Sequence, residues 1–270
     1  MLTGLMYRIL LTNDDGIHSE GLSKLEESLK EVGEVYTVAP AAEMSGASHS
    51  LTLSRPLRIR KIDNRHWTVD GTPTDCVTLA LNKILQPEER PHICVSGINY
   101  GGNLGDDASY SGTVAGALEA TILGVPGLAF SLVTREKFDF THAAHFAIGA
   151  VQKALADGLP EGTLLNINIP PGAIRGVRVT RQGIKSARPI ISEHIDPRGK
   201  AYFWIGEEVI ISGYDDGTDY HAVEQGFVSV TPMRSDMTNH HALERITDWN
   251  SSPVEADNTV AQENQPVEHA

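Results

Sequence analysis

The sequence predicts an α/β protein in which a mainly parallel sheet is flanked by helices, with a β-rich C-terminal extension. Short apolar segments alternate with amphipathic helical segments through the first two thirds of the chain, a pattern typical of βαβ units. Beyond Pro170 short strand-like segments with polar connections replace this alternation. We therefore expect a core over residues 7–170, an extension over residues 171–250 and a disordered acidic tail over residues 251–270.

The first helix is predicted by the spacing of apolar residues after the first strand. Leu22, Leu25, Leu29 and Val32 recur three and four positions apart, and Gly33 follows them. This spacing predicts an amphipathic helix that stops at a glycine.

The second helix is predicted from its N-terminus. Thr72 suits the N-cap, Pro73 the first helical position and Asp75 the first turn. Residues 56–69, which precede it, have the pattern of a hairpin. Further helices are expected at residues 111–124 and 143–155, and strands at residues 9–11, 35–39, 93–95, 128–132 and 164–169.

The extension is predicted to contain strands at residues 177–180, 201–205 and 209–211 and a last helix at 235–249. Tyr202, Phe203 and Trp204 stand in succession within a predicted hairpin over residues 189–211. A protruding hairpin with exposed aromatic surface needs a partner, so we expect it to hold subunits together. The alternative is a strand whose aromatic side chains pack into a core of the same subunit.

Composition excludes several classes of partner. The hydrophobic fraction of 40% and the charged fraction of 21% are those of a soluble globular protein. A net charge of −13 argues against a nucleic-acid polymer or an anionic membrane as partner. The N-terminus lacks the pattern of a secretory signal, and Cys76 and Cys94 are expected to be buried free thiols. These features predict a cytoplasmic protein.

Two adjacent carboxylates, Asp14 and Asp15, follow the first apolar run and precede Gly16. Adjacent acids repel each other unless a cation or a shared proton lies between them, which favours a metal site. The simpler alternative is an Asx turn, in which each Asp accepts a bond from a nearby backbone amide.

Two further loops carry oxygen ligands and glycines after an apolar run, residues 39–48 and 96–107. Loops at the carboxyl ends of neighbouring parallel strands converge on one crevice, so the three loops are expected to share a site. Their carboxylate, hydroxyl and amide oxygens favour Mg²⁺ or Mn²⁺ over zinc. His18 and His49 lie near these loops and are more simply explained as structural residues.

Ser111, Gly112 and Thr113 open a predicted helix. A helix start with a glycine and two hydroxyls can bind an anion through free amides, although an ordinary N-cap at Ser111 is the simpler explanation. A metal beside such an anion site would suit a phosphoryl hydrolase. The glycines match neither a dinucleotide-binding nor a P-loop motif.

Seven groups of residues together strongly resemble the SurE family, the stationary-phase survival protein 5′-nucleotidases. The resemblance covers roughly residues 7–249, and several long motifs in the right order make it specific. The motifs are residues 8–16 (RILLTNDDG), 39–40 with 45–48 (AP and SGAS), 71–76 (GTPTDC), 96–99 (SGIN) with Gly101 and Asn103, 110–114 (YSGTV), 217–219 (GTD) and 226–232 (GFVSVTP).

The resemblance implies a Rossmann-like core and hydrolysis of nucleoside monophosphates with one divalent metal ion per subunit, Mg²⁺ or Mn²⁺. It also implies a C-terminal extension exchanged within a homodimer, which can pair into a homotetramer. The family's metal ligands correspond to Asp14, Asp15, Ser45 and Asn99, and its catalytic role to the two aspartates. Its phosphate and substrate contacts correspond to Gly46, Asn103, Ser111, Gly112 and Thr113.

Several alternatives stay open at this point. The attacking group could be water or Asp14 itself, through a phosphoaspartate. Nucleoside 3′-monophosphates and short polyphosphate are further candidate substrates, and a nucleotide-binding sensor without turnover is a different class of function. The departures from the family are small: His49 stands where Asn is common, and five residues precede Met6, a candidate start.

Overall fold

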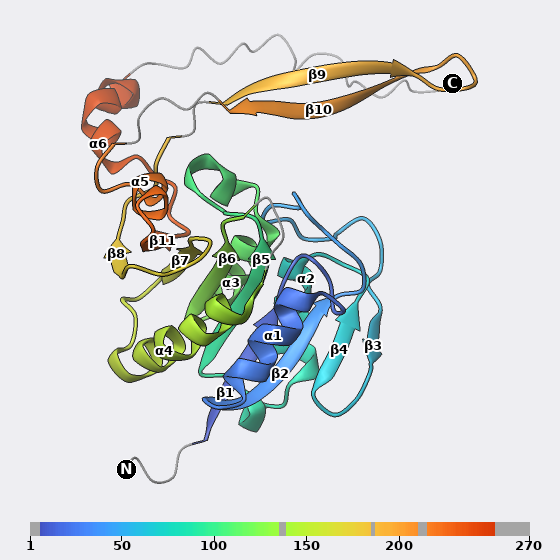
Figure 1. The fold of residues 1–270 in the computed structure, drawn as a ribbon, viewed down its shortest axis with the longest axis vertical. Coiled ribbons are helices and arrows are strands. Elements are labelled where there is room, and N and C mark those ends of the chain that lie inside the picture. The colour runs from blue at the N-terminus through green and yellow to red at the C-terminus, as the bar shows by residue number, and fades with distance from the viewer. Residues whose placement is uncertain (1–5, 135–138, 185–186, 210–214, 252–270) are drawn as a thin grey trace, which may run out of the picture. The chain divides into compact units, whose positions relative to one another are not determined.

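The computed structural model describes residues 6–134, 139–184, 187–209 and 215–251. The chain divides into two compact units, Met1–Ser235 and Asp236–Ala270. The first contains a nine-stranded sheet in the order β3-β4-β2-β1-β5-β6-β7-β11-β8 and a two-stranded sheet of β9 and β10 (Figure 1). The main strands are β1 (Tyr7–Thr12), β2 (Gly33–Pro40), β3 (Ile59–Lys61), β4 (His66–Val69), β5 (Ile93–Tyr100), β6 (Gly127–Leu132), β7 (Thr163–Ile169), β8 (Val177–Val179) and β11 (Val228–Arg234).

Six neighbouring strands, from β4 through β2, β1, β5 and β6 to β7, run parallel. Strand β3 pairs antiparallel with β4, and β11 pairs antiparallel with β7. The predicted mainly parallel α/β fold is therefore confirmed. The helices are α1 (Glu20–Leu29), α2 (Pro73–Leu79) with a π-helical continuation (Ala80–Ile84), α3 (Gly112–Ile122), α4 (Thr141–Asp157) and α5 (Asp219–Glu224).

Successive residues of the central strand β1 face opposite layers, as the pleat requires. Leu11 packs in a core with Leu25 of α1 and Val151 of α4, while Leu10 packs with Val77 of α2 on the other face. Helices α1 and α4 thus cover one face, and α2 and α3 lie together over the other. Burial on both faces explains why the parallel strands appear in the sequence as continuous apolar runs.

The predicted start of α2 and the hairpin before it are confirmed, whereas the predicted role of Gly33 is wrong. Thr72 and Asp75 form a reciprocal capping box at the start of α2, with Pro73 in its first turn. The predicted hairpin before α2 is the antiparallel pair of β3 and β4. Gly33, however, does not stop α1, which ends at Leu29, but begins β2. A Cβ on Gly33 would lie 2.3 Å from the Tyr7 carbonyl oxygen, so the glycine permits close pairing of β1 and β2.

The predicted extension contributes strands to the main sheet, because β11 returns beside β7 and β8 pairs with β11. The division of the chain at residues 170 and 250 stays a prediction. The expected hairpin is formed by β9 (Ala187–Ile195) and β10 (Ala201–Val209). The strand expected at 201–205 is longer than predicted, since β10 is continuous to Val209. Residues 210–211 of the strand expected at 209–211 lie outside the described residues.

The second unit begins with α6 (His240–Leu243), followed by a 3₁₀ helix (Glu244–Ser251). The predicted terminal helix therefore starts five residues later than expected, where Asn239 caps it. The predicted disordered tail lies outside the described residues, apart from Ser251. Among the residues that the structure describes, no helix combines the length and the apolar composition of a membrane span.

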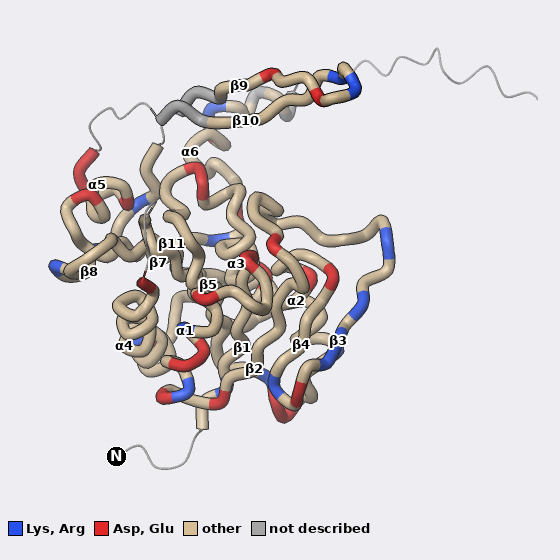
Figure 2. Tube along the Cα trace, turned by 45° about the vertical axis from the view of Figure 1, so that its right-hand side comes forward, with Lys and Arg blue, Asp and Glu red and all other residues tan. Residues whose placement is uncertain are grey.

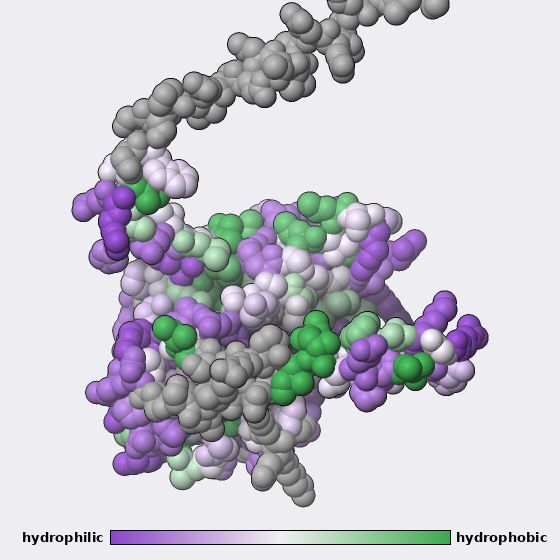
Figure 3. Space-filling view, turned by 90° about the horizontal axis from the view of Figure 1, so that it is seen from above, coloured by the Kyte–Doolittle hydropathy of each residue, from purple (hydrophilic) through white to green (hydrophobic). Residues whose placement is uncertain are grey.

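Charge and hydropathy are distributed unevenly over the surface. Lys and Arg segments follow one another along the edge strand β3, whereas Asp and Glu are spread over many elements (Figure 2). In the view from above, hydrophobic side chains lie among hydrophilic ones (Figure 3). Exposed hydrophobic residues of the hairpin include Ile191, Ile195, Phe203, Trp204 and Ile205.

Candidate functional site

The turn after β1 is stabilised by Asn13 rather than by the two aspartates. The Asn13 carboxamide accepts a bond from the Gly16 amide at 3.2 Å and donates to the Gly16 carbonyl at 3.1 Å. It also donates to Ser19, the N-cap of α1, at 2.7 Å. Gly16 has a φ of 96°, a conformation that glycine adopts without strain. The Asx turn is therefore present, but its side chain is Asn13, so the turn does not account for Asp14 and Asp15.

Asp14 is buried against the first turn of α3. Its Oδ1 accepts a hydrogen bond from the Thr113 hydroxyl. Burial raises the pKa of Asp14, and the bond from Thr113 together with backbone amides of Gly112 and Thr113 opposes that rise. A Cβ on Gly112 would lie 2.7 Å from the Asp14 Cβ. Glycine at this position is therefore what lets α3 approach the carboxylate.

Asp15 is half-buried beside Asp14. Its pKa is raised to about 6, first by burial and then by the charges of Asp14 and Glu43, against a backbone bond from Tyr100. Among the described residues, no Lys or Arg acts on this pKa. Two neighbouring carboxylates without a basic partner are stabilised in their charged form by a bound cation. The donor chemistry of the site therefore fits a divalent metal.

The loop after β2 is tied to both neighbouring segments. The Met44 amide donates to the Asp14 carbonyl at 2.7 Å, and the Ser48 amide donates to the Tyr110 carbonyl at 3.0 Å. Between these anchors Ser45 is exposed, with its hydroxyl donating to Glu43 at 2.8 Å. Gly46 is also exposed, and open space surrounds the position of its missing side chain. The loop thus places Ser45 and Gly46 between the acidic turn and the start of α3.

Asn99 lies in β5 and not in a loop, which corrects the prediction that the strand ends at residue 95. Strand β5 continues to Tyr100, with an irregular register against β6 between Ser96 and Asn99. The Asn99 amide donates to the Gly101 carbonyl at 2.8 Å. Because β5 pairs with β1, the carboxyl ends of the two strands lie side by side, which brings Asn99 to the edge of the sheet that carries Asp14.

Asn103 is held by a buried polar network that the sequence analysis missed. Its backbone N–H donates to Asn168 Oδ1 and its side-chain amide donates to Ser131, at 2.8 and 2.7 Å. The Asn103 carbonyl accepts from Asn166 and Asn168 at 2.8 and 3.2 Å. The signal was available: two asparagines at alternate positions of a strand that is otherwise apolar place their amides on one face.

Ser111 is the N-cap of α3 and accepts a bond from the Val114 amide at 3.1 Å. The simpler explanation weighed for this residue therefore holds, and an anion contact would be an additional role. Thr113 is fully buried and its hydroxyl is committed to Asp14. The sequence placed Thr113 with the phosphate contacts and apart from the metal ligands, whereas the structure attaches it directly to one of those ligands.

His49 has a structural partner, as expected for a lone histidine. Its Nε2 lies 2.8 Å from Oε2 of the buried Glu119, and Thr78 donates to the other Glu119 oxygen at 2.7 Å. His18 is exposed. Within the described parts of the chain, His, Cys, Asp and Glu side chains do not gather in threes to form a metal site. A metal at the acidic turn would therefore need neutral oxygen ligands, which Ser45 and Asn99 can supply.

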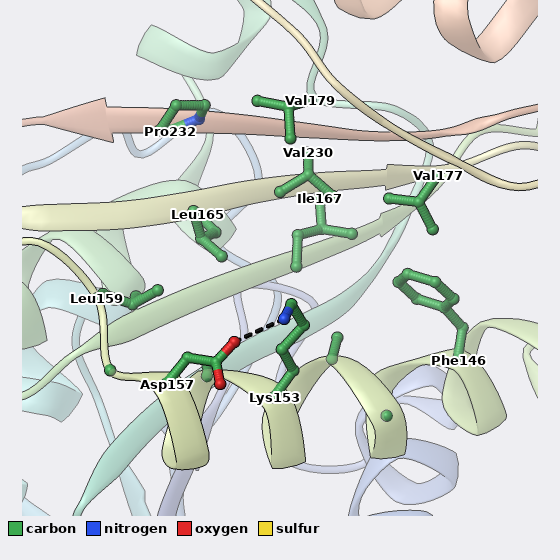
Figure 4. Close-up of a pocket in the computed structure, with 14 residues that line it drawn as sticks. Phe146, Lys153, Asp157, Leu159, Leu165, Ile167, Val177, Val179, Val230 and Pro232 are labelled. Atoms are coloured by element: carbon green, nitrogen blue, oxygen red, sulfur yellow. Dashed lines mark hydrogen bonds and ion pairs between the residues drawn. The ribbon is translucent and has the colours of Figure 1, made fainter.

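A cavity of about 500 Å³ lies elsewhere, between α4 and the strands β7, β11 and β8 (Figure 4). Figure 4 shows Phe146 of α4 close to Val177 of β8, and Lys153 of α4 below Ile167 and paired to Asp157. Its lining is almost entirely apolar and contains none of the predicted site residues. It is therefore unsuited to a nucleotide phosphate, and the cluster around Asp14 remains the candidate active site.

The chain is similar to known proteins along most of its length. The family model described as survival protein SurE matches residues 9–189. The chain is 46% identical over 243 residues to the 5′-nucleotidase SurE of Syntrophotalea carbinolica, covering 89% of this chain and 96% of that protein. It is 48% identical over 244 residues to the 5′-nucleotidase SurE of Myxococcus xanthus, covering 90% of this chain and 93% of that protein.

A solved structure resembles the whole fold. The crystal structure of the SurE protein from Aquifex aeolicus matches with a TM-score of 0.81 and 46% identity, over 91% of this chain and 100% of that one. The family model covers more than half of the chain, and the relatives match it along nearly their full length. The chain therefore belongs to the SurE family.

Proposed function

We propose that this protein is a divalent-metal-dependent 5′-nucleotidase that hydrolyses nucleoside 5′-monophosphates to nucleoside and phosphate. The relatives that bear this name match nearly the whole chain at about 46% identity. The observation that carries the proposal is the position of Asp14, whose charge acts on the neighbouring Asp15 and which also accepts the Thr113 bond from the start of α3. A cation-binding group and an anion-binding helix start therefore meet at one side chain.

Asp14, Asp15, Ser45 and Asn99 would hold the metal, which when bound would polarise the phosphate and lower the pKa of a bound water. The protein's own residues supply the remaining functions. Asp14, which the Thr113 hydroxyl holds in place, would orient the attacking water or accept its proton. Gly46, Asn103, Ser111, Gly112 and Thr113 would contact the phosphate, and of these Gly112 and Thr113 lie against Asp14.

We further propose one metal ion per subunit, Mg²⁺ or Mn²⁺, because every suggested ligand atom is a hard oxygen. A homodimer or homotetramer is supported by the exposed aromatic residues of the β9–β10 hairpin. A cytoplasmic location is supported by the two buried free cysteines. Nucleoside 3′-monophosphates and short polyphosphate remain further candidate substrates, because the proposed ligands contact the metal and the phosphate and do not select the leaving group.

The test is phosphate release from a panel of nucleoside 5′- and 3′-monophosphates and tripolyphosphate, with Mg²⁺, with Mn²⁺ and with a chelator. We expect metal-dependent release from the 5′-monophosphates and at least a 10²-fold loss in Asp14→Asn. Glu31→Gln, which changes an exposed acid just after α1, is the matched control and should stay active. Nucleotide binding without phosphate release would instead identify a sensor and contradict the proposal.

A further inference from the structure

Two tyrosines flank the candidate active site, each next to a predicted ligand in the chain. Tyr110 precedes Ser111, the cap of α3, and the residue is 66% exposed. Tyr100 follows Asn99, and the residue is 42% exposed. An exposed aromatic ring offers a flat apolar face on which a planar ligand can stack.

The backbone of Tyr110 is fixed on both sides, although its ring is exposed. The Tyr110 amide donates to the Asp107 carbonyl at 3.0 Å, and its carbonyl accepts from the Ser48 amide at 3.0 Å. The Ser48 hydroxyl also donates to the neighbouring Ser109 carbonyl at 2.7 Å. The ring is therefore carried on a rigid segment that joins the loop of Ser45 to the start of α3, and the ring itself plays no part in these bonds.

A nucleoside monophosphate carries a flat aromatic base a few bonds away from its phosphate. When the phosphate binds at the start of α3, the base must lie nearby, within a distance comparable to the length of a tyrosine side chain. Stacking on an aromatic ring suits any base, because every base has a π-face. Stacking also needs no positively charged side chain, which suits a protein with a net negative charge.

We propose that Tyr110 is the residue on which the nucleobase of the substrate stacks. The proposal rests on the proposed function and adds the site for the base. Tyr110 is favoured over Tyr100 because it adjoins the predicted phosphate contacts, whereas the Tyr100 backbone adjoins the metal ligand Asp15. A stacking residue should favour nucleotides over phosphate esters without a base, and it should discriminate weakly among the four bases.

The experiment compares two substrates, AMP and ribose 5-phosphate, which share the ribose and phosphate and differ by the base. In Tyr110→Ala the KM for AMP should rise about tenfold, with kcat changed little, while the KM for ribose 5-phosphate stays unchanged. Tyr110→Phe, which keeps the ring, should behave as the wild type, and Tyr110→Leu should resemble Tyr110→Ala. Ile122→Ala truncates an exposed apolar side chain at the other end of α3 and is the matched control.

Equal changes for the two substrates in Tyr110→Ala would overturn the proposal, as would a base-dependent effect in Tyr100→Ala alone. Thermal melting of each variant separates a folding defect from a binding defect, and Tyr110→Phe and Tyr110→Leu keep the test available if Tyr110→Ala is unstable. Hydrolysis of both substrates by the wild type is measured first. A wild type that hydrolyses neither would reject the proposed function, whereas active enzyme without a base effect rejects only the role of Tyr110.

Discussion

The Thr113 hydroxyl donates a hydrogen bond to Oδ1 of Asp14, so the first turn of α3 and the end of β1 meet at one buried carboxylate. The bond holds the carboxylate in one orientation and favours its charged form. A threonine at a helix start that was predicted to contact phosphate thus acts on a predicted metal ligand. This arrangement links the metal and phosphate groups of the site through a single side chain.

Replacement of Thr113 by Val should weaken metal binding. The substitution keeps the shape of the side chain and removes the donor, which leaves the buried Asp14 charge without this partner. Hydrogen bonds to charged groups are worth about 1.5–3 kcal/mol, so we expect roughly tenfold or more loss of Mn²⁺ affinity by calorimetry. Thr113→Ser keeps the donor and should retain most of the affinity. Unchanged Mn²⁺ affinity in Thr113→Val would contradict this prediction and would mean that Thr113 acts on the phosphate alone.

Removing the charge of Asp15 should abolish turnover and stabilise the metal-free protein. Burial of Asp15 and its repulsion from Asp14 and Glu43 raise its pKa. At neutral pH they therefore destabilise the folded protein when Asp15 is charged. In Asp15→Asn this destabilisation disappears, so the melting temperature of the metal-free protein should rise. Thermal melting with EDTA and with Mn²⁺ measures the effect. A lower melting temperature in EDTA would show that Asp15 has a favourable partner in the free protein.

Asp219 should stabilise the folded protein, because it joins the segment around Gly105 to the segment around Gly183. This buried carboxylate accepts bonds from the amides of Gly105, Gly183 and Tyr220, at 2.8, 2.9 and 2.9 Å. Burial raises its pKa and the three bonds oppose that rise. In Asp219→Asn an amide N–H would face a backbone N–H, which should cost about 1–3 kcal/mol in urea unfolding. The exposed neighbour Asp215→Asn is the control and should cost less than about 0.5 kcal/mol.

The pair of His49 and Glu119 should make stability depend on acid pH. The bond from His49 lowers the pKa of Glu119, burial opposes this, and the Thr78 bond lowers the pKa further. A carboxyl whose pKa is lowered on folding stabilises the protein above its ordinary pKa of 4.5, and this stability is lost as pH falls through the lower value of the folded protein. Urea unfolding of Glu119→Gln should therefore show its largest deficit near neutral pH, and the deficit should shrink below pH 4.5.

A pH-independent deficit in Glu119→Gln would mean that the Glu119 charge plays no part and that only its shape or its bond to Thr78 matters. His49→Asn separates these possibilities. It removes the partner and leaves the acid, so it should lose part of the same stability.

Replacing Phe203 and Trp204 by Ser should dissociate the oligomer. Both side chains are more than half exposed, in a hairpin that forms its own two-stranded sheet. The alternative in which these aromatic residues pack into a core of their own subunit does not agree with this exposure. Light scattering should give a smaller species for the double variant than for Lys200→Ser at the hairpin turn, with unchanged circular dichroism. A monomeric wild type would contradict the prediction.

Local signals in the sequence determined most of the elements and the chemical character of the site. The alternation of strands and helices, the capping box of Thr72 and Asp75 and the acid pair after β1 all depend on residues close together in the chain. Their physical basis is short-range: apolar periodicity, cap bonds and the repulsion of adjacent charges. The neighbouring strands of βαβ units follow from the same signals, because a helix between two strands lets the second strand return parallel to the first.

Only the tertiary structure decided which polar groups meet. Thr113 and Asp14 are 99 positions apart, and Gly105 and Asp219 are 114 apart, so no local pattern pairs them. Likewise, Gly33 has the pattern of a helix stop, and its true role depends on the approach of Tyr7. A buried polar group takes whichever partner the packed sheet and helices bring within hydrogen-bond distance, since leaving it unpaired is costly. The sequence therefore determined the site's chemistry, and the folding of β1, β5 and α3 together decided how its residues are joined.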